Sequence, residues 1–196
     1  MTNLFKPLAV LAFIGALFST TAAAGSDIPS KKKTREGLYL TAVQAAKMLQ
    51  NESILFVDVR SRAEVSFVGL PTRVNANIPL MLMPKDAVYD PDKQTYKLQF
   101  NPDFVFAFES LLSDLDYDEN APIVLICRSG SRSAKAANLL NELGYMKIYS
   151  VIDGFEGDKM AEGPHAGHRE LNGWKNAGLE WSYHLTPAQH YIMDGD

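Results

Sequence analysis

The chemistry-bearing part of this sequence surrounds its single cysteine, which begins the run Cys127-Arg128-Ser129-Gly130-Ser131-Arg132-Ser133. The run follows an apolar segment typical of a buried strand and precedes a segment typical of a helix. Small residues at such a junction let successive backbone N–H groups point inward, which forms an anion-binding nest at the positive end of the helix dipole. Helix N-termini and nearby cations stabilise a thiolate, the nucleophilic form of cysteine.

Two interpretations of Cys127 are open, a structural cysteine at the end of a core strand and a working thiol. The arginines Arg128 and Arg132 favour the working thiol, because such cations are out of place at a purely apolar site. With one cysteine in the chain, no disulfide can form within the molecule.

The elements around this run alternate between strands and helices. We expect strands at 54–59, 123–127 and 147–151, and helices at 41–50, 101–115 and 133–143. Thr41 with Gln44 fits a capping box for the first helix, and Asn101 with Pro102 fits the start of the second. This alternation predicts an α/β fold with a parallel sheet, in which ligands lie at the carboxyl ends of strands. Cys127 lies at such an end.

Four segments, in order, resemble the rhodanese family between about Leu38 and Tyr183. They are Phe56-Val57-Asp58-Val59-Arg60 with Glu64, the stretch 69–79, the loop 127–132, and Trp174 with Gly178. The resemblance implies a three-layer fold with a central, mainly parallel five-stranded sheet flanked by helices. It also implies a sulfurtransferase, in which Cys127 attacks the outer sulfur of a donor such as thiosulfate and holds a persulfide for an acceptor.

The resemblance also implies roles for the neighbouring residues. The backbone amides from Arg128 through Ser129, Gly130 and Ser131 to Arg132 would stabilise the anionic sulfur, and the two arginines would attract the donor. Asp58 and Arg60 would brace the loops. The sequence departs from the family pattern at Leu70, in the length of 69–79, at 153–155 and in the late Trp174, so the substrate stays open.

Two other functions use a similar cysteine loop. Cysteine phosphatases and arsenate reductases use a C-x5-R loop, whereas 127–132 is C-x4-R, a tighter ring suited to one sulfur atom. A persulfide carrier or redox-sensing module would use the same loop without high turnover, and the loop chemistry alone does not separate it from an enzyme.

The N-terminus has the three parts of a secretory signal peptide: Lys6, an apolar run at 8–18, and small residues ending at Ala24. We expect cleavage after Ala24, a periplasmic or secreted protein, and no stable membrane anchor after cleavage. The expected organisation is a leader at 1–24, a flexible lead-in at 25–37, a domain at 38–185 and a tail at 186–196. Insertions interrupt the domain at 81–100, which contains a turn at 90–93, and at 154–173.

The net charge and the position of the basic residues restrict the classes of partner that the protein could bind. The formal net charge of −4 argues against nucleic acid, and the basic run 31–33 is interpreted as solvated lead-in. The expected partners are a small anionic sulfur donor and a thiol, cyanide or protein acceptor, with no cofactor.

His165 and His168 lie near Glu156, Asp158 and Glu162 in the second insertion. This spacing is a weak ligand pattern, so no metal is assigned. The same insertion follows the strand at 147–151, and we expect it near the mouth of the Cys127 pocket. The alternative is a solvated loop packed away from that pocket.

Overall fold

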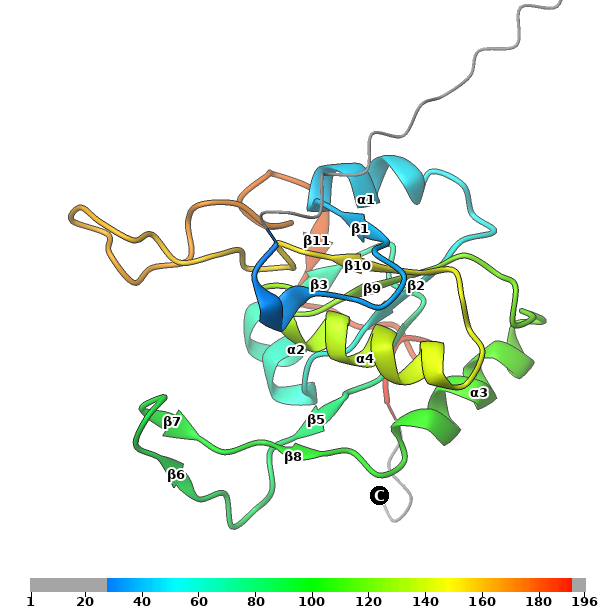
Figure 1. The fold of residues 1–196 in the computed structure, drawn as a ribbon, viewed down its shortest axis with the longest axis horizontal. Coiled ribbons are helices and arrows are strands. Elements are labelled where there is room, and N and C mark those ends of the chain that lie inside the picture. Colours follow the sequence, from blue (N-terminus) through cyan, green and yellow to red (C-terminus); the bar gives the residue numbers. More distant parts are fainter. Residues whose placement is uncertain (1–27, 192–196) are drawn as a thin grey trace, which may run out of the picture.

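A computed structural model describes residues 28–191. Its centre is a parallel sheet with the strand order β1-β10-β9-β2-β4 (Figure 1). The strands are β1 Tyr39–Leu40, β10 Ile148–Val151, β9 Ile123–Ile126, β2 Leu55–Asp58 and β4 Ala76–Asn77. The expected five-stranded parallel sheet is confirmed.

Four helices cover the two faces of this sheet: α1 Ala42–Met48, α2 Arg62–Val68, α3 Phe104–Asp114 and α4 Ser131–Glu142. Alternate residues of each strand point to opposite faces. Phe56 of β2 therefore packs in a core with residues of α1 and α2, whereas Leu55 and Val57 pack with residues of α3 and α4. These two apolar cores make the three-layer architecture.

The first residues of the helices only partly match those predicted from the sequence. The capping box of Thr41 and Gln44 is present, as predicted. The helix expected to begin at Asn101 and Pro102 begins instead at Phe104. Asn101 closes a turn before the helix, in which its Oδ1 accepts the Asp103 N–H at 3.1 Å. Its side chain is buried, and its N–H groups donate to the Pro79 carbonyl at 2.8 Å and to the Tyr191 hydroxyl at 3.1 Å.

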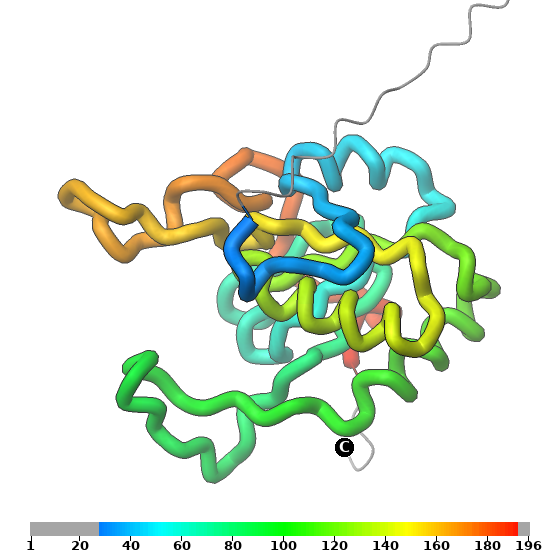
Figure 2. The backbone as a smooth tube through the Cα atoms, in the orientation of Figure 1, coloured from blue at the N-terminus to red at the C-terminus, as the bar shows by residue number. Residues whose placement is uncertain are grey.

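The two insertions leave the body on the side where the central strands end (Figures 1 and 2). In the first, β5 Met81–Leu82 pairs with β8 Gln99–Phe100, and β6 Tyr89–Asp90 pairs with β7 Thr95–Tyr96. The predicted turn at 90–93 closes the outer hairpin, with Asp90 Oδ1 accepting the N–H groups of Asp92 and Lys93.

The second insertion is a loop closed at its neck. The Trp174 N–H donates to the Gly154 carbonyl at 2.9 Å, and the Gly173 N–H donates to Asp153 Oδ2 at 3.2 Å. The other carboxylate oxygen of Asp153 accepts the Ala42 N–H at 2.8 Å, which ties the neck to α1. Beyond it, β11 Trp181–Ser182 pairs with β3 Leu70–Pro71.

The ends of the described chain depart from the expected flexible lead-in and tail. A short 3-10 helix, η1 Ser30–Lys32, packs against α4, and Lys32 is buried. The Lys32 ammonium donates to the Ile152 carbonyl at 2.8 Å and pairs with Asp158 at 2.7 Å. At the other end Tyr191 is buried in the core beside α3. The solvated interpretation of the run 31–33 is therefore wrong at Lys32, because its buried charge has an acidic partner.

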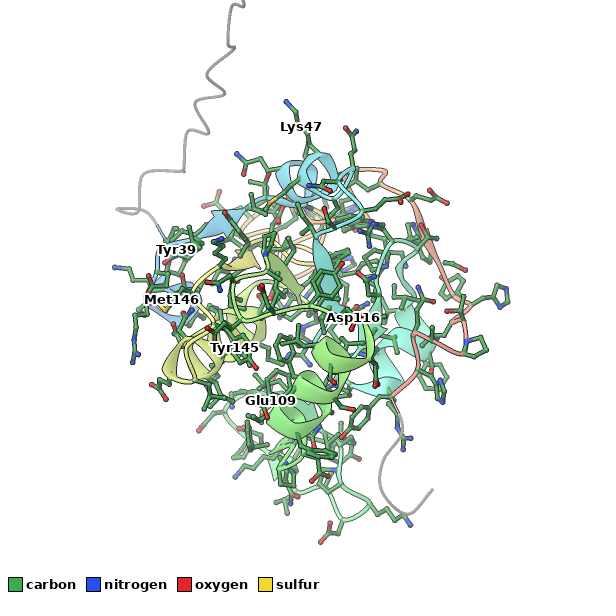
Figure 3. All side chains as sticks on the ribbon, turned by 90° about the vertical axis from the view of Figure 1, so that its right-hand side faces the viewer. Tyr39, Lys47, Glu109, Asp116, Tyr145 and Met146 are labelled. Atoms are coloured by element: carbon green, nitrogen blue, oxygen red, sulfur yellow. The ribbon has the colours of Figure 1, made fainter. Side chains whose placement is uncertain are left out.

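On the side of the molecule opposite the two insertions, Tyr145 packs against α3. Figure 3 shows this side, with Glu109 and Tyr145 labelled. The ring of Tyr145 meets Phe108 of α3 edge-on at 5.8 Å between centroids. Burial raises the pKa of Tyr145, and the charge of Glu109 adds to the rise.

Across residues 28–191, none of the helices is long and apolar enough to cross a membrane. The predicted signal peptide lies outside the described residues.

Candidate active site

Cys127 directly follows β9 and lies at the N-terminal end of α4, as the sequence predicts. Its Sγ accepts the Gly130 N–H at 3.2 Å and lies 3.6 Å from Ser133 Oγ. Ser133 is held in turn by the Gly130 carbonyl, to which its hydroxyl donates, and by the Ser150 hydroxyl, which donates to it at 2.9 Å. The first N–H groups of an α-helix have no intrahelical acceptor, so this end of α4 presents N–H donors and the positive end of the helix dipole on the side of Sγ.

Two glycines make the tight path of the loop possible. Gly130 has φ +93°, and a Cβ there would overlap the Ile152 carbonyl. Gly154 has φ +65°, and a Cβ there would overlap the backbone of Cys127 and Arg128. Because L-residues with side chains rarely adopt such angles, these positions require glycine for conformational and for steric reasons.

The start of the second insertion lies against the loop. The Phe155 N–H donates to the Cys127 carbonyl at 2.8 Å, and the Glu156 N–H donates to the Arg128 carbonyl at 3.0 Å. The insertion therefore begins beside the cysteine, while its outer part extends away from the body of the fold (Figure 2).

Arg132 is engaged in an ion pair. Its guanidinium donates two hydrogen bonds to the carboxylate of Glu64, at 2.5 and 2.6 Å. Glu64 also accepts hydrogen bonds from the N–H and hydroxyl of Ser61, the N-cap of α2. Burial acts to raise the pKa of Glu64, but the hydrogen bonds and charge of Arg132 and the bonds from Ser61 lower it to about 2. The carboxylate is therefore ionised at neutral pH and occupies the guanidinium that was expected to attract a donor.

Asp58 and Arg60 are fully buried and pair with each other. Arg60 also donates to the Gly69 carbonyl at 2.7 Å and stacks on the Phe155 ring, with Cζ 4.1 Å from the centroid. Through Phe155, this pair supports the segment that lies against the cysteine loop.

Arg128 is exposed, and Ser129 and Ser131 are partly exposed on the same loop. The second insertion contributes another cation, Arg169, whose Nη1 donates to the Gly157 carbonyl at 2.6 Å. Partial burial and the charge of Arg128 lower the pKa of Arg169, while the charges of Glu156 and Asp158, and to a smaller extent that of Cys127, act in the opposite direction. Arg128 and Arg169 are thus near enough to sense each other and the cysteine.

A family model for the rhodanese-like domain matches residues 41–161. The chain belongs to the rhodanese family. This confirms the resemblance carried by the D-V-R segment and the six-residue loop, whereas Trp174 lies beyond the matched residues.

Related proteins and structures agree with this assignment. An uncharacterized protein of Rickettsia rickettsii is 33% identical over 136 residues, covering 69% of this chain and 89% of its own. The thiosulfate sulfurtransferase GlpE of Glaesserella parasuis is 28% identical over 125 residues, covering 64% of this chain and 89% of its own. The crystal structure of Rv0390 from M. tuberculosis superposes with a TM-score of 0.54 and 31% identity, covering 74% of this chain and 97% of that one.

Several residues at this rhodanese loop had no assigned role in the sequence prediction. The partnership of Glu64 with Arg132 was missed, although Ser61-x-x-Glu64 has the pattern of a capping box and could have placed the carboxylate at the start of a helix. Ser133 and Ser150 support the sulfur through a contact that no local pattern signals. The sequence offers Arg169, with His165 and His168, as a positive or hydrogen-bonding group of the second insertion that could face a donor.

The histidines of the second insertion come together with an acid that the sequence analysis did not single out. His165 and His168 both contact Glu170. Asp158, which lies near the histidines in the sequence, pairs instead with Lys32.

Proposed function

We propose that this rhodanese is a sulfurtransferase that moves sulfane sulfur from a thiosulfate-like donor to an acceptor through a persulfide on Cys127. The observation that carries the proposal is the position of Sγ, which accepts the Gly130 N–H at the N-terminal end of α4. This position favours the thiolate before the reaction and the terminal sulfur anion after it. The likeness to a thiosulfate sulfurtransferase supports it.

The transfer takes place in two balanced steps. The Cys127 thiolate attacks the outer sulfur of thiosulfate, a sulfur–sulfur bond forms to Cys127, and the donor's sulfur–sulfur bond breaks with its electron pair leaving on sulfite. An acceptor nucleophile, such as cyanide or a thiolate, then attacks the terminal sulfur of the persulfide. The electron pair of that bond returns to Cys127, which restores the thiolate without an external oxidant or reductant.

The shape of the site favours a small donor. Cys127 is only 1% exposed, so a donor must bring a slender terminal sulfur atom to it. Arg128 and Arg169 are the cations that we assign to donor attraction, because the guanidinium of Arg132 is occupied by Glu64. Arg132 contributes through its positive charge and by positioning the loop.

We propose that the protein acts in the periplasm or outside the cell, because residues 1–24 have the pattern of a cleaved signal peptide. Its proposed partners are a small anionic sulfur donor and a thiol, cyanide or protein acceptor.

Steady-state formation of thiocyanate from thiosulfate and cyanide tests this function. The wild-type chain is expected to turn over many times, and Cys127→Ser is expected to be inactive because the chain has no second cysteine. A single stoichiometric transfer without turnover would instead identify a persulfide carrier. Undiminished activity of Cys127→Ser would overturn the mechanism.

A further inference from the structure

The outer part of the second insertion brings two imidazoles and one carboxylate together. His165 Nδ1 lies 2.6 Å from one oxygen of Glu170, and His168 Nδ1 lies 3.4 Å from the other. One ligand atom from each of the three side chains lies within 4.8 Å of the other two. The two imidazole rings are 5.6 Å apart between centroids.

The backbone of this insertion holds the three residues in place. The Met160 N–H donates to the His168 carbonyl at 2.8 Å, the Gly167 N–H donates to the Met160 carbonyl at 2.9 Å, and the His168 N–H donates to the His165 carbonyl at 3.0 Å. Gly167 has φ +88°, which allows the sharp turn between the two histidines. The histidine backbones are therefore held by a network of hydrogen bonds, and only their side chains need to rotate to bind a ligand.

On the other side of the histidines, Arg169 anchors the chain next to Glu170. Its guanidinium donates to the Gly157 carbonyl, and the Asn176 side chain donates to the Arg169 carbonyl at 3.0 Å. The Glu170 backbone is thus held close to the neck of the insertion.

We propose that His165, His168 and Glu170 bind a divalent transition-metal ion of the Zn²⁺ or Cu²⁺ type. Imidazole and carboxylate are ligands that suit these ions. With metal–ligand bonds of about 2.0–2.2 Å, ligand atoms around a tetrahedral ion lie roughly 3.4 Å apart. The present separations of 2.6 and 3.4 Å from Nδ1 to the carboxylate oxygens need only small side-chain rotations to reach that spacing.

Charge and exposure are consistent with this site. A glutamate carboxylate is ionised at neutral pH because its ordinary pKa is about 4.3, and a neutral imidazole offers a ring nitrogen to a metal ion. All three side chains are solvent-exposed. An ion held by three protein ligands there would keep at least one position open to water, as open three-ligand sites do.

Titration calorimetry with ZnCl₂ tests the site directly. The chain should carry no histidine tag, and the Cys127→Ser background removes the thiolate as a competing ligand. We expect one Zn²⁺ per chain in this background. The double variant His165→Ala, His168→Ala should bind at least tenfold more weakly, whereas His184→Ala, His190→Ala, which removes the same number of imidazoles elsewhere, should bind as the parent does.

Electron paramagnetic resonance of the Cu²⁺-loaded protein gives a second readout. We expect nitrogen coupling from two imidazoles, which is lost in the His165 and His168 variant, and an altered spectrum in Glu170→Gln. Circular dichroism should show that every variant is folded. The proposal is overturned if no stoichiometric binding occurs, or if removing His165 and His168 weakens Zn²⁺ binding no more than removing His184 and His190.

Discussion

Glu64 and Arg132 are joined by two hydrogen bonds, with Nη1 2.6 Å from Oε2 and Nη2 2.5 Å from Oε1. Glu64 belongs to the first turn of α2, and Arg132 to the first turn of α4. The pair therefore connects the two helix starts near the cysteine. It also occupies the guanidinium of the arginine that ends the loop.

Replacing Glu64 by Gln is expected to lower stability in a pH-dependent way. The pKa of Glu64 is lowered from 4.5 to about 2 on folding, so its contribution is present above pH 4.5 and disappears as the pH falls towards 2. By linkage, the contribution is at most about 3 kcal/mol. Urea unfolding at a series of pH values should show the largest gap between wild type and Glu64→Gln at neutral pH, shrinking in acid.

The matched control for this prediction is Glu142→Gln, which removes an exposed pair with Arg35. Such a surface pair contributes about 1 kcal/mol or less. Equal losses in the two variants, or a Glu64→Gln gap that does not change with pH, would contradict the role of the Glu64–Arg132 pair.

Arg169→Ala is expected to weaken donor capture. Removing a cation that senses both Arg128 and Cys127 should raise KM for thiosulfate about three- to tenfold through lost electrostatic attraction. Alkylation by neutral iodoacetamide should change little. Lys159→Ala makes the same charge change in the same insertion and should leave KM near the wild-type value. Similar losses with thiosulfate and iodoacetamide would argue against a donor-binding role.

Gly130→Ala is expected to disrupt the cysteine loop, because the new Cβ would overlap the Ile152 carbonyl at a backbone angle of φ +93°. The loss in unfolding free energy should exceed about 2 kcal/mol. Gly144→Ala is the control, since Gly144 has φ +102° with no atom within 4 Å of its added Cβ, so it tests conformational strain without overlap. If both variants lose the same stability, steric overlap at Gly130 is not the cause.

Lys32→Met is expected to loosen the neck of the second insertion. It removes the ammonium that bonds both the Ile152 carbonyl and Asp158, which should cost about 1–3 kcal/mol and speed proteolytic cleavage within 154–173. Lys31 is exposed, and Lys31→Met should be cleaved at the wild-type rate. Unchanged cleavage of Lys32→Met would show that the neck does not depend on this contact.

The sequence predicted the parts of the fold that leave a local signal. The apolar runs that became β2, β9 and β10 were located to within one residue at each end, because buried parallel strands are apolar on both faces. The two-residue strands β1 and β4 left no such pattern. The start of α3 was misplaced because Asn101 closes a turn before the helix. Its Oδ1 accepts the Asp103 N–H, while its side-chain N–H groups bond Pro79 and Tyr191 across the fold.

The site likewise has features that leave a local signal in the sequence and features that do not. The nature of Cys127 and its loop could be predicted, since a strand, a glycine-containing turn and a helix are adjacent in the chain. The pairing of Arg132 with Glu64, 68 residues away, depends on how α2 and α4 meet. Lys32 was interpreted as part of a solvated lead-in because its partner Asp158 lies 126 residues further along the chain.

Intact-mass spectrometry after incubation with thiosulfate tests the central claim most directly. The wild-type chain should gain the mass of one sulfur atom, peptide mapping should place it on Cys127, and added cyanide should remove it. Cys127→Ser should gain nothing under the same conditions. A wild-type chain that gains no sulfur, or sulfur carried by a residue other than Cys127, would contradict the account.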